Sequence, residues 1–216
     1  MKNALIIGGT GLTGKKLTKY LLADKRYGSV KLLVRKPLDI SYEKLDQVTF
    51  NFDNPDASKV MADEVYCCLG TTIGEAGSKK AFYQVDYEYV LMLANIAFKN
   101  GCKKFALISS MGANKKSLIF YSKTKGQIEE AIKAIGFENC FIFRPSILLG
   151  TRHQSRFGES VSKFFLTKIS FLLPEKFRPI HSKSVAFAMQ FVMNGNYSGF
   201  TIFESDEIAA IANNPH

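Results

Sequence analysis

Short apolar runs alternate with amphipathic stretches along most of the chain. Residues 4–7 form an apolar run that stops at Gly8, which is typical of a strand buried on both faces of a parallel sheet. Comparable runs predict further strands at residues 30–34, 48–52, 65–69, 105–109, 140–143 and 200–203. Helical periodicity predicts helices from about residue 11, at 81–99 and at 122–135. This alternation predicts an α/β fold with a doubly wound parallel sheet.

No Gly/Ser-rich or Pro-rich linker and no repeat divides the 216 residues, so we expect a single domain. Residues 151–199 are basic and include an apolar segment at 164–173 that suits an amphipathic or buried helix. We interpret this region as a small cap on the substrate side of the domain. Its charge suits an anionic substrate, a protein partner, a lipid surface or a solvated face, and we expect little membrane association.

The net charge of +10 suggests anionic ligands without identifying them. No nucleic-acid-binding motif accompanies the charge, so we expect no nucleic-acid partner. The four cysteines include no Cys-x-x-Cys pair, and the sequence therefore predicts neither a metal site nor a disulfide framework. The apolar run before Gly8 is too short for a signal peptide or a membrane span. Together with free thiols, this predicts a cytoplasmic protein.

A glycine-rich loop, Gly-Gly-Thr-Gly-Leu-Thr-Gly at residues 8–14, follows the first predicted strand and opens the first helix. This context favours a dinucleotide site, because glycines let backbone N–H groups approach a pyrophosphate at a helix N-terminus. A P-loop is excluded, since Lys16 stands where serine or threonine must bind magnesium. A tight turn without a ligand is the alternative. The predicted cofactor contacts in the loop are Gly8, Thr10, Gly11, Leu12, Thr13 and Gly14.

The second predicted strand ends in Arg35 and Lys36, where a fold selective for NAD usually carries a carboxylate for the ribose 2′-hydroxyl. Two cations suit a 2′-phosphate instead, so the sequence predicts NADP(H) in preference to NAD(H). The alternative is a solvated Arg-Lys turn at a strand end.

Tyr121 and Lys125 form a Tyr-x-x-x-Lys sequence at the start of a predicted helix, which places both side chains on one face, one turn apart. A lysine ammonium stabilises a phenolate, so the tyrosine can exchange a proton near neutral pH. Ser109 and Ser110 end a predicted strand, and ligand sites of open α/β sheets lie beyond such ends. We predict Tyr121, Lys125 and a serine at this strand end as catalytic residues.

Together these motifs resemble the short-chain dehydrogenase/reductase superfamily, which has a glycine loop, a strand-end serine and Tyr-x-x-x-Lys in this order. The sequence is closer still to the small atypical members typified by the Tat-interacting-protein-like NAD(P)-binding oxidoreductases. Further similar segments are Cys-Leu-Gly-Thr-Thr at 68–72, Val-Asp-Tyr at 85–87, Ser-Ser-Met-Gly-Ala at 109–113 and Phe-Arg-Pro-Ser-Ile-Leu-Leu at 143–149. The similarity spans nearly the whole chain.

The resemblance implies further cofactor contacts. In that family the Leu-Gly-Thr-Thr turn lies along the cofactor and the Arg-Pro segment passes near the nicotinamide. The implied contacts are Leu69, Gly70, Thr71 and Pro145, in addition to Tyr121 and Lys125. Asp53 corresponds to a position that meets the adenine ring, although Asp-Asn-Pro equally suits a turn. Asp86 stands where many members place a catalytic asparagine, so the resemblance assigns no proton relay to that helix.

The resemblance implies an NADP(H)-binding oxidoreductase that transfers hydride between the nicotinamide and a carbonyl or alcohol substrate. In the reductive direction, Ser110 hydrogen-bonds the carbonyl oxygen, Tyr121 protonates it, and Lys125 supports the tyrosine and holds the nicotinamide ribose. The alternative is a non-catalytic NADP(H)-binding redox sensor or protein-interaction regulator, because small members of the superfamily include such proteins.

Overall fold

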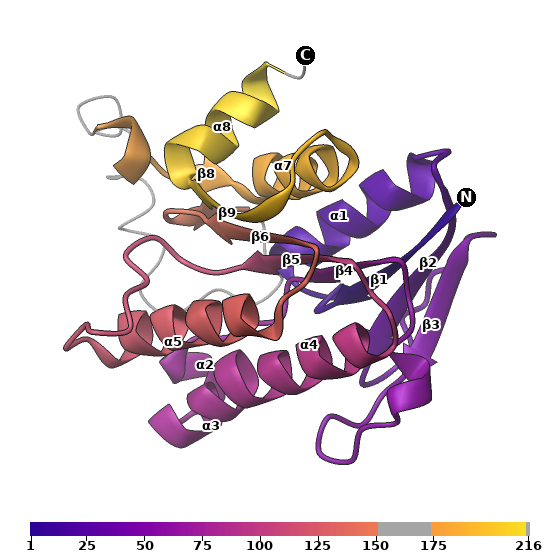
Figure 1. The fold of residues 1–216 in the computed structure, drawn as a ribbon, viewed down its shortest axis with the longest axis horizontal. Coiled ribbons are helices and arrows are strands. Elements are labelled where there is room, and N and C mark those ends of the chain that lie inside the picture. The colour runs from indigo at the N-terminus through magenta and orange to yellow at the C-terminus, as the bar shows by residue number, and fades with distance from the viewer. Residues whose placement is uncertain (151–173, 215–216) are drawn as a thin grey trace.

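The computed structural model describes residues 1–150 and 174–214 and is built on a seven-stranded sheet in which all neighbouring strands are parallel (Figure 1). The strand order is β3-β2-β1-β4-β5-β6-β9. These strands are β1 (Lys2–Ile7), β2 (Tyr27–Val34), β3 (Leu45–Thr49), β4 (Glu64–Cys67), β5 (Lys104–Ile108), β6 (Asn139–Arg144) and β9 (Gly199–Glu204). A separate parallel pair is formed by β7 (Leu148–Leu149) and β8 (Ile180–His181). The predicted doubly wound parallel sheet is confirmed.

Each strand of the seven-stranded sheet contributes side chains to two hydrophobic cores, because successive side chains of a strand point to opposite faces of the sheet. In β1, Ile6 packs in one core while Leu5 and Ile7 pack in the other. Helices cover both faces (Figure 1): one is covered by α1 (Leu12–Ala23), α7 (Ser182–Asn194) and α8 (Ser205–Asn213), the other by α4 (Val90–Lys99) and α5 (Phe120–Ile135). Burial on both faces explains why these strands appear in the sequence as continuous apolar runs.

The predicted helix at 81–99 consists of three consecutive helical pieces. The helical segments between β4 and β5 are α2 (Ile73–Ala76), α3 (Lys79–Tyr83), the π-helical segment η2 (Gln84–Tyr89) and α4. A π-turn inserts a residue into the helix and so changes the direction in which nearby side chains point. Here it carries Asp86, which is 1% exposed. The remaining short elements are the 3₁₀ turns η1 (Ala57–Lys59) and η4 (Glu175–Phe177).

The third strand begins and ends earlier than its apolar pattern predicts, at Leu45–Thr49 rather than 48–52. Phe50 and Phe52 lie beyond the strand yet still pack in the second core. Their ring centroids are 5.2 Å apart, in an edge-to-face arrangement. Burial of the segment that follows the strand therefore accounts for the apolar residues that the sequence assigns to it.

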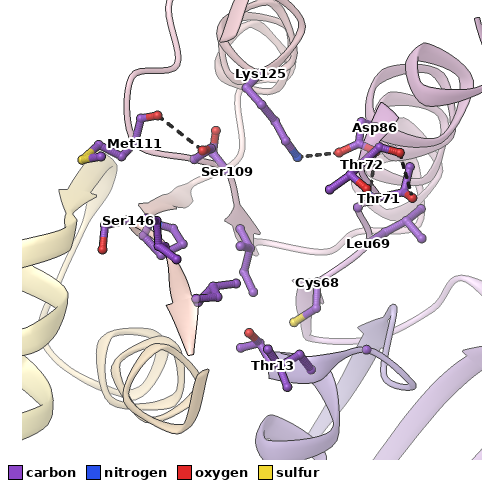
Figure 2. Close-up of a pocket in the computed structure, with 18 of the residues that line it drawn as sticks. Thr13, Cys68, Leu69, Thr71, Thr72, Asp86, Ser109, Met111, Lys125 and Ser146 are labelled. Atoms are coloured by element: carbon purple, nitrogen blue, oxygen red, sulfur yellow. Dashed lines mark hydrogen bonds and ion pairs between the residues drawn. The ribbon is translucent and has the colours of Figure 1, made fainter. Parts of the chain in front are cut away.

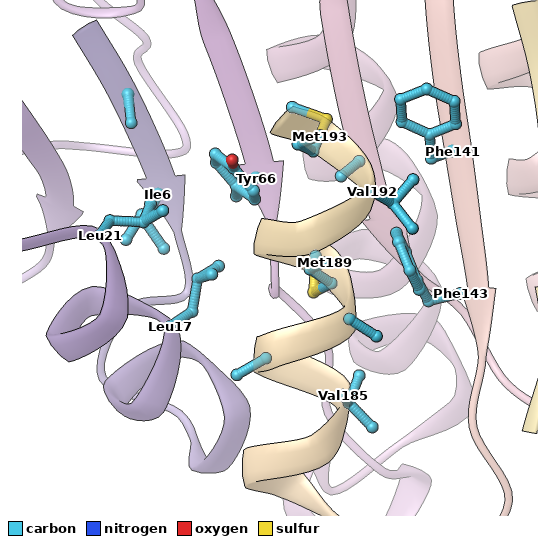
Figure 3. Packing of buried hydrophobic residues seen from close by; sticks show 14 of the residues in the cluster. Ile6, Leu17, Leu21, Tyr66, Phe141, Phe143, Val185, Met189, Val192 and Met193 are labelled. Atoms are coloured by element: carbon cyan, nitrogen blue, oxygen red, sulfur yellow. The ribbon is translucent and has the colours of Figure 1, made fainter. Parts of the chain in front are cut away.

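The predicted cap at 151–199 is wrong in its second half. Residues 182–194 form α7, a helix of the main layer that lies beside α1 over the sheet (Figure 3). Val185, Met189 and Val192 are fully buried, at the spacing of three and four residues that faces one side of a helix. The first part of the predicted cap, residues 151–173 with the expected helix at 164–173, lies outside the described residues.

Candidate cofactor and active site

A cavity of about 390 Å³ opens at the carboxyl ends of β1, β4, β5 and β6 (Figure 2). The strand order reverses at β1, and ligands of doubly wound sheets bind at such switch points. Most of the predicted site residues line this cavity: Gly11, Leu12, Thr13, Leu69, Gly70, Thr71, Ser110, Tyr121, Lys125 and Pro145. The remaining predicted residues lie outside its lining: Gly8, Thr10, Gly14, Arg35, Lys36 and Asp53.

The glycine loop packs backbone against backbone. Gly8 has a φ of +79°, and a Cβ atom there would stand 2.7 Å from the Cys68 carbonyl group. A Cβ atom on Gly14 would stand 2.2 Å from the Gly8 carbonyl oxygen. The Gly11 N–H donates a hydrogen bond of 3.0 Å to that same oxygen. Glycine at positions 8 and 14 is therefore required by the turn itself, and this turn brings the first residues of α1 to the cavity.

The first turn of α1 presents a hydroxyl group that lacks a hydrogen-bond partner within the described residues. Thr13 lines the cavity, is 4% exposed, and its Oγ1 is unpaired there. A buried hydroxyl without a partner costs free energy. An anionic oxygen at this helix N-terminus would satisfy the hydroxyl and would also be favoured by the helix dipole. Thr13 and the N-terminus of α1 thus fit the pyrophosphate of a dinucleotide.

The two serines at the end of β5 have different surroundings. Ser109 is buried and donates a hydrogen bond from its hydroxyl to the Glu129 carboxylate. Ser110 is partly exposed and lines the cavity, with its Oγ 3.3 Å from the Met111 carbonyl oxygen. Ser109 also lines the cavity, but its hydroxyl is already bonded to Glu129, which favours Ser110 as the residue that meets a ligand.

Tyr121 and Lys125 lie one turn apart in the first half of α5. The Tyr121 ring packs against Phe82, with 5.3 Å between the ring centroids. Gly126, the next residue after Lys125, allows the preceding loop to cross the helix: a Cβ atom there would stand 2.2 Å from the backbone nitrogen of Lys115. This close crossing fixes the path of the β5–α5 loop next to the cavity.

Lys125 is buried and forms an ion pair with Asp86, with 2.7 Å between Nζ and Oδ1 (Figure 2). Burial by itself lowers the pKa of a lysine, but the Asp86 carboxylate and Tyr121 outweigh it and raise the pKa of Lys125 above its usual value. Lys125 therefore carries a positive charge at neutral pH. The ion pair of Asp86 with Lys125 is a feature of the site that the sequence does not predict. The one sign of it in the sequence is that an aspartate stands where many superfamily members have an asparagine.

Arg144 forms a second charged cluster behind the site. Its guanidinium lies between Glu129 of α5 and Glu204 at the end of β9, with Nη1 3.0 Å from Glu204 Oε1 and Nε 3.0 Å from Glu129 Oε1. The two carboxylates raise the pKa of Arg144. This cluster ties the end of β6, and so Pro145, to α5. The Phe-Arg-Pro segment can be identified in the sequence, but its pattern does not assign a role to Arg144.

Arg35, Lys36 and Asp53 lie along the edge of the sheet beyond the cavity. Arg35 and Lys36 are exposed at the end of β2, next to the start of the glycine loop because Leu33 pairs with Ile7. The Asp53 carboxylate accepts a hydrogen bond from the Tyr89 hydroxyl, which raises the pKa of Tyr89 to about 12. The backbone N–H of Asp53 also donates to the Asn51 side chain at 2.9 Å, as in a turn.

Comparison with known proteins shows which family the chain belongs to. A protein family described as NAD(P)H-binding matches residues 8–170. The chain belongs to this family. Protein HTATIP2 of Rattus norvegicus is 37% identical over 170 residues, which cover 76% of this chain and 70% of that protein. Protein FMP52 of Eremothecium gossypii is 32% identical over 166 residues, which cover 75% of this chain and 74% of that protein. The resemblance to the Tat-interacting-protein-like members is confirmed.

Solved structures share the fold of this NAD(P)H-binding chain. MoeE5 in complex with UDP-glucose and NAD has a TM-score of 0.70 and 12% identity, covering 97% of this chain and 80% of that one. Human epimerase family protein SDR39U1 with NADPH has a TM-score of 0.60 and 18% identity. The match covers 94% of this chain and 74% of that one. The family membership indicates a nicotinamide cofactor, and the neighbours include complexes with each of the two forms.

The prediction of a cytoplasmic protein is wrong, because the fungal FMP52 relatives are named mitochondrial. Free thiols do not distinguish a cytosolic from a mitochondrial protein, so they could not support the choice. In the ranges 1–150 and 174–214, none of the helices is long and apolar enough to cross a membrane.

Proposed function

We propose that the protein is an NADP(H)-dependent oxidoreductase that transfers hydride between the nicotinamide and a carbonyl or alcohol substrate. The observation that carries this proposal is the convergence of Ser110, Tyr121 and Lys125 on one cavity that begins at the N-terminus of α1. A protein that only stored the cofactor would need no hydroxyl groups beside a buried lysine. The arrangement therefore favours an enzyme over a non-catalytic sensor or regulator.

The residues of this chain divide into those that hold the cofactor and those that act on the substrate. Thr13 and the glycine loop would hold the pyrophosphate, Lys125 the nicotinamide ribose, and Arg35 with Lys36 a 2′-phosphate. The bound cofactor supplies or accepts the hydride. Ser110 orients the substrate oxygen, and Tyr121 gives or takes its proton. Catalysis by these side chains is mainly orientation and electrostatic stabilisation.

Binding and turnover measured on the same protein test the proposal. The purified chain is titrated with NADPH by fluorescence and then mixed with a panel of aldehydes and ketones while NADPH absorbance is followed. We expect binding together with oxidation of NADPH by at least one carbonyl compound. Tight binding without turnover across the panel would instead favour the sensor, and absence of NADPH and NADH binding would contradict both interpretations.

Replacement of Arg35 by alanine tests the choice of cofactor. We expect the wild-type protein to bind NADPH more tightly than NADH, and Arg35→Ala to weaken NADPH binding about 10- to 150-fold, since a charge-assisted contact contributes about 1.5–3 kcal/mol. Affinity for NADH should stay unchanged. Lys99→Ala removes an exposed cation from the end of α4 and is the matched control. Equal affinities for NADPH and NADH in the wild type would contradict this assignment.

A further inference from the structure

One carboxylate joins two walls of the cavity. Asp86 Oδ1 lies 2.7 Å from Lys125 Nζ, and the two side chains are 0% and 6% exposed. The other oxygen, Oδ2, accepts a hydrogen bond of 2.8 Å from the backbone N–H of Thr71. Asp86 therefore contacts both α5 and the turn that follows β4 (Figure 2).

The backbone on both sides is shaped to allow this contact. The π-helical segment η2 carries Asp86 and places it among buried residues. On the other wall, a Cβ atom at Gly70 would stand 3.2 Å from Asp86 Oδ1 and 3.5 Å from Lys125 Nζ. A side chain at position 70 would crowd the pair, so glycine keeps this space open.

We infer that Asp86 is a positioning residue of the proposed active site, whose carboxylate holds the Lys125 ammonium group against the turn at Thr71 and balances its charge beside Tyr121. The inference rests on the roles proposed for Lys125 and Tyr121. It assigns to Asp86 a task that an asparagine at the same position would not perform, because an amide carries no charge to balance the lysine.

In the part of the chain that the structure describes, the titratable groups with the largest effect on Lys125 are Asp86 of η2, Tyr121 of α5 and Cys67 of β4. Burial raises the pKa of the Cys67 thiol to about 12, so this thiol is neutral at physiological pH. The Asp86 carboxylate is the charge that compensates the ammonium group. At neutral pH the Asp86 carboxylate therefore offsets part of the ammonium charge that acts on Tyr121.

Removal of the Asp86 carboxylate alone should shift the pH dependence of turnover in one direction. Burial would then favour the neutral amine, so Lys125 would lose its proton at lower pH than in the wild type. While it remains protonated, its uncompensated charge would favour the ionised phenol, and the tyrosine would exchange its proton at lower pH as well. In the reductive direction both groups act in their protonated forms, so the alkaline limb of the pH–rate profile should move toward lower pH in Asp86→Asn.

The pairing is first tested without any use of activity. We expect Asp86→Asn to lower Tm by about 5–15 °C, because it leaves a buried charge unpaired. The double variant Asp86→Asn/Lys125→Met should recover much of this loss, since it removes both charges, and its loss should be smaller than the sum of the losses in Asp86→Asn and in Lys125→Met. Glu130→Gln is the control: Glu130 forms an ion pair with Lys115 at the same 2.7 Å, but the two side chains are 54% and 52% exposed. Its Tm should hardly change. Strictly additive effects in the cycle would overturn the inference, whether or not the protein proves to be an enzyme.

The pH dependence of turnover then tests the charge balance. Asp86→Asn should shift the profile of kcat toward lower pH by about one unit or more, whereas Glu130→Gln should leave it in place. A loss of turnover in Asp86→Asn at every pH, with no shift of the profile, would show that the carboxylate does not balance the lysine charge. Failure to find any turnover in the wild type would overturn the proposed function while leaving the thermal cycle to decide the ion pair.

Discussion

Replacement of Tyr121 by phenylalanine is expected to lower turnover about 10²–10⁴-fold, the usual contribution of a positioned general acid. The substitution keeps the ring, which packs against Phe82 at 5.3 Å between centroids, and removes only the hydroxyl group. Affinity for NADPH should therefore change little. The measurement compares kcat and the dissociation constant of NADPH in the two proteins, with a carbonyl substrate that the wild type accepts.

Two further variants make this result specific. Tyr42→Phe removes a hydroxyl from a tyrosine that is 52% exposed in the loop between β2 and β3, and it should have wild-type turnover. Lys125→Ala should impair both turnover and NADPH binding, because Lys125 is assigned to the ribose as well as to the tyrosine. A Tyr121→Phe protein with undiminished activity would contradict the catalytic assignment.

The fold could be predicted from the sequence because its strands are buried on both faces and appear as apolar runs between helices. The place of α7 in the fold does not follow from the sequence, for a physical reason. Its apolar positions, including Val185 and Met189, recur at helical spacing, but the segment follows a basic stretch and resembles a continuation of it. Which helix covers the sheet beside α1 is a tertiary choice that periodicity does not encode.

Features of the site that lie within one segment can be predicted from the sequence, whereas contacts between distant segments cannot. Tyr121 and Lys125 lie on one helix, so their spacing predicts a shared face. Ser109 and Ser110 are adjacent and must point in different directions at the strand end, and the structure shows that Ser109 is held by Glu129. The contact of Asp86 with Lys125 joins segments far apart in the sequence, and it depends on a π-turn that has no clear sequence pattern.

Replacement of Gly14 by alanine is expected to destabilise the protein and to weaken cofactor binding together. A Cβ atom there would stand 2.2 Å from the Gly8 carbonyl oxygen and 2.8 Å from the Gly9 Cα. These are backbone atoms, so the clash cannot be relieved by a change of rotamer. The free energy of unfolding should fall by about 2–3 kcal/mol, near the upper end for overpacking. Because the glycine loop must move, affinity for NADPH should fall at least about 100-fold.

Gly74→Ala is the matched control, since Gly74 lies in the short helix α2 with nothing within 4 Å of the position of its Cβ atom. Alanine in that helix should leave NADPH affinity unchanged and alter the free energy of unfolding by at most about 1 kcal/mol, toward greater stability. Chemical denaturation and NADPH titration measure both quantities for each variant. A Gly14→Ala protein that is destabilised but binds NADPH as tightly as the wild type would show that the loop serves only as a tight turn. That outcome would contradict the assignment of the pyrophosphate to the N-terminus of α1, because a displaced loop cannot keep its N–H groups directed at the same ligand.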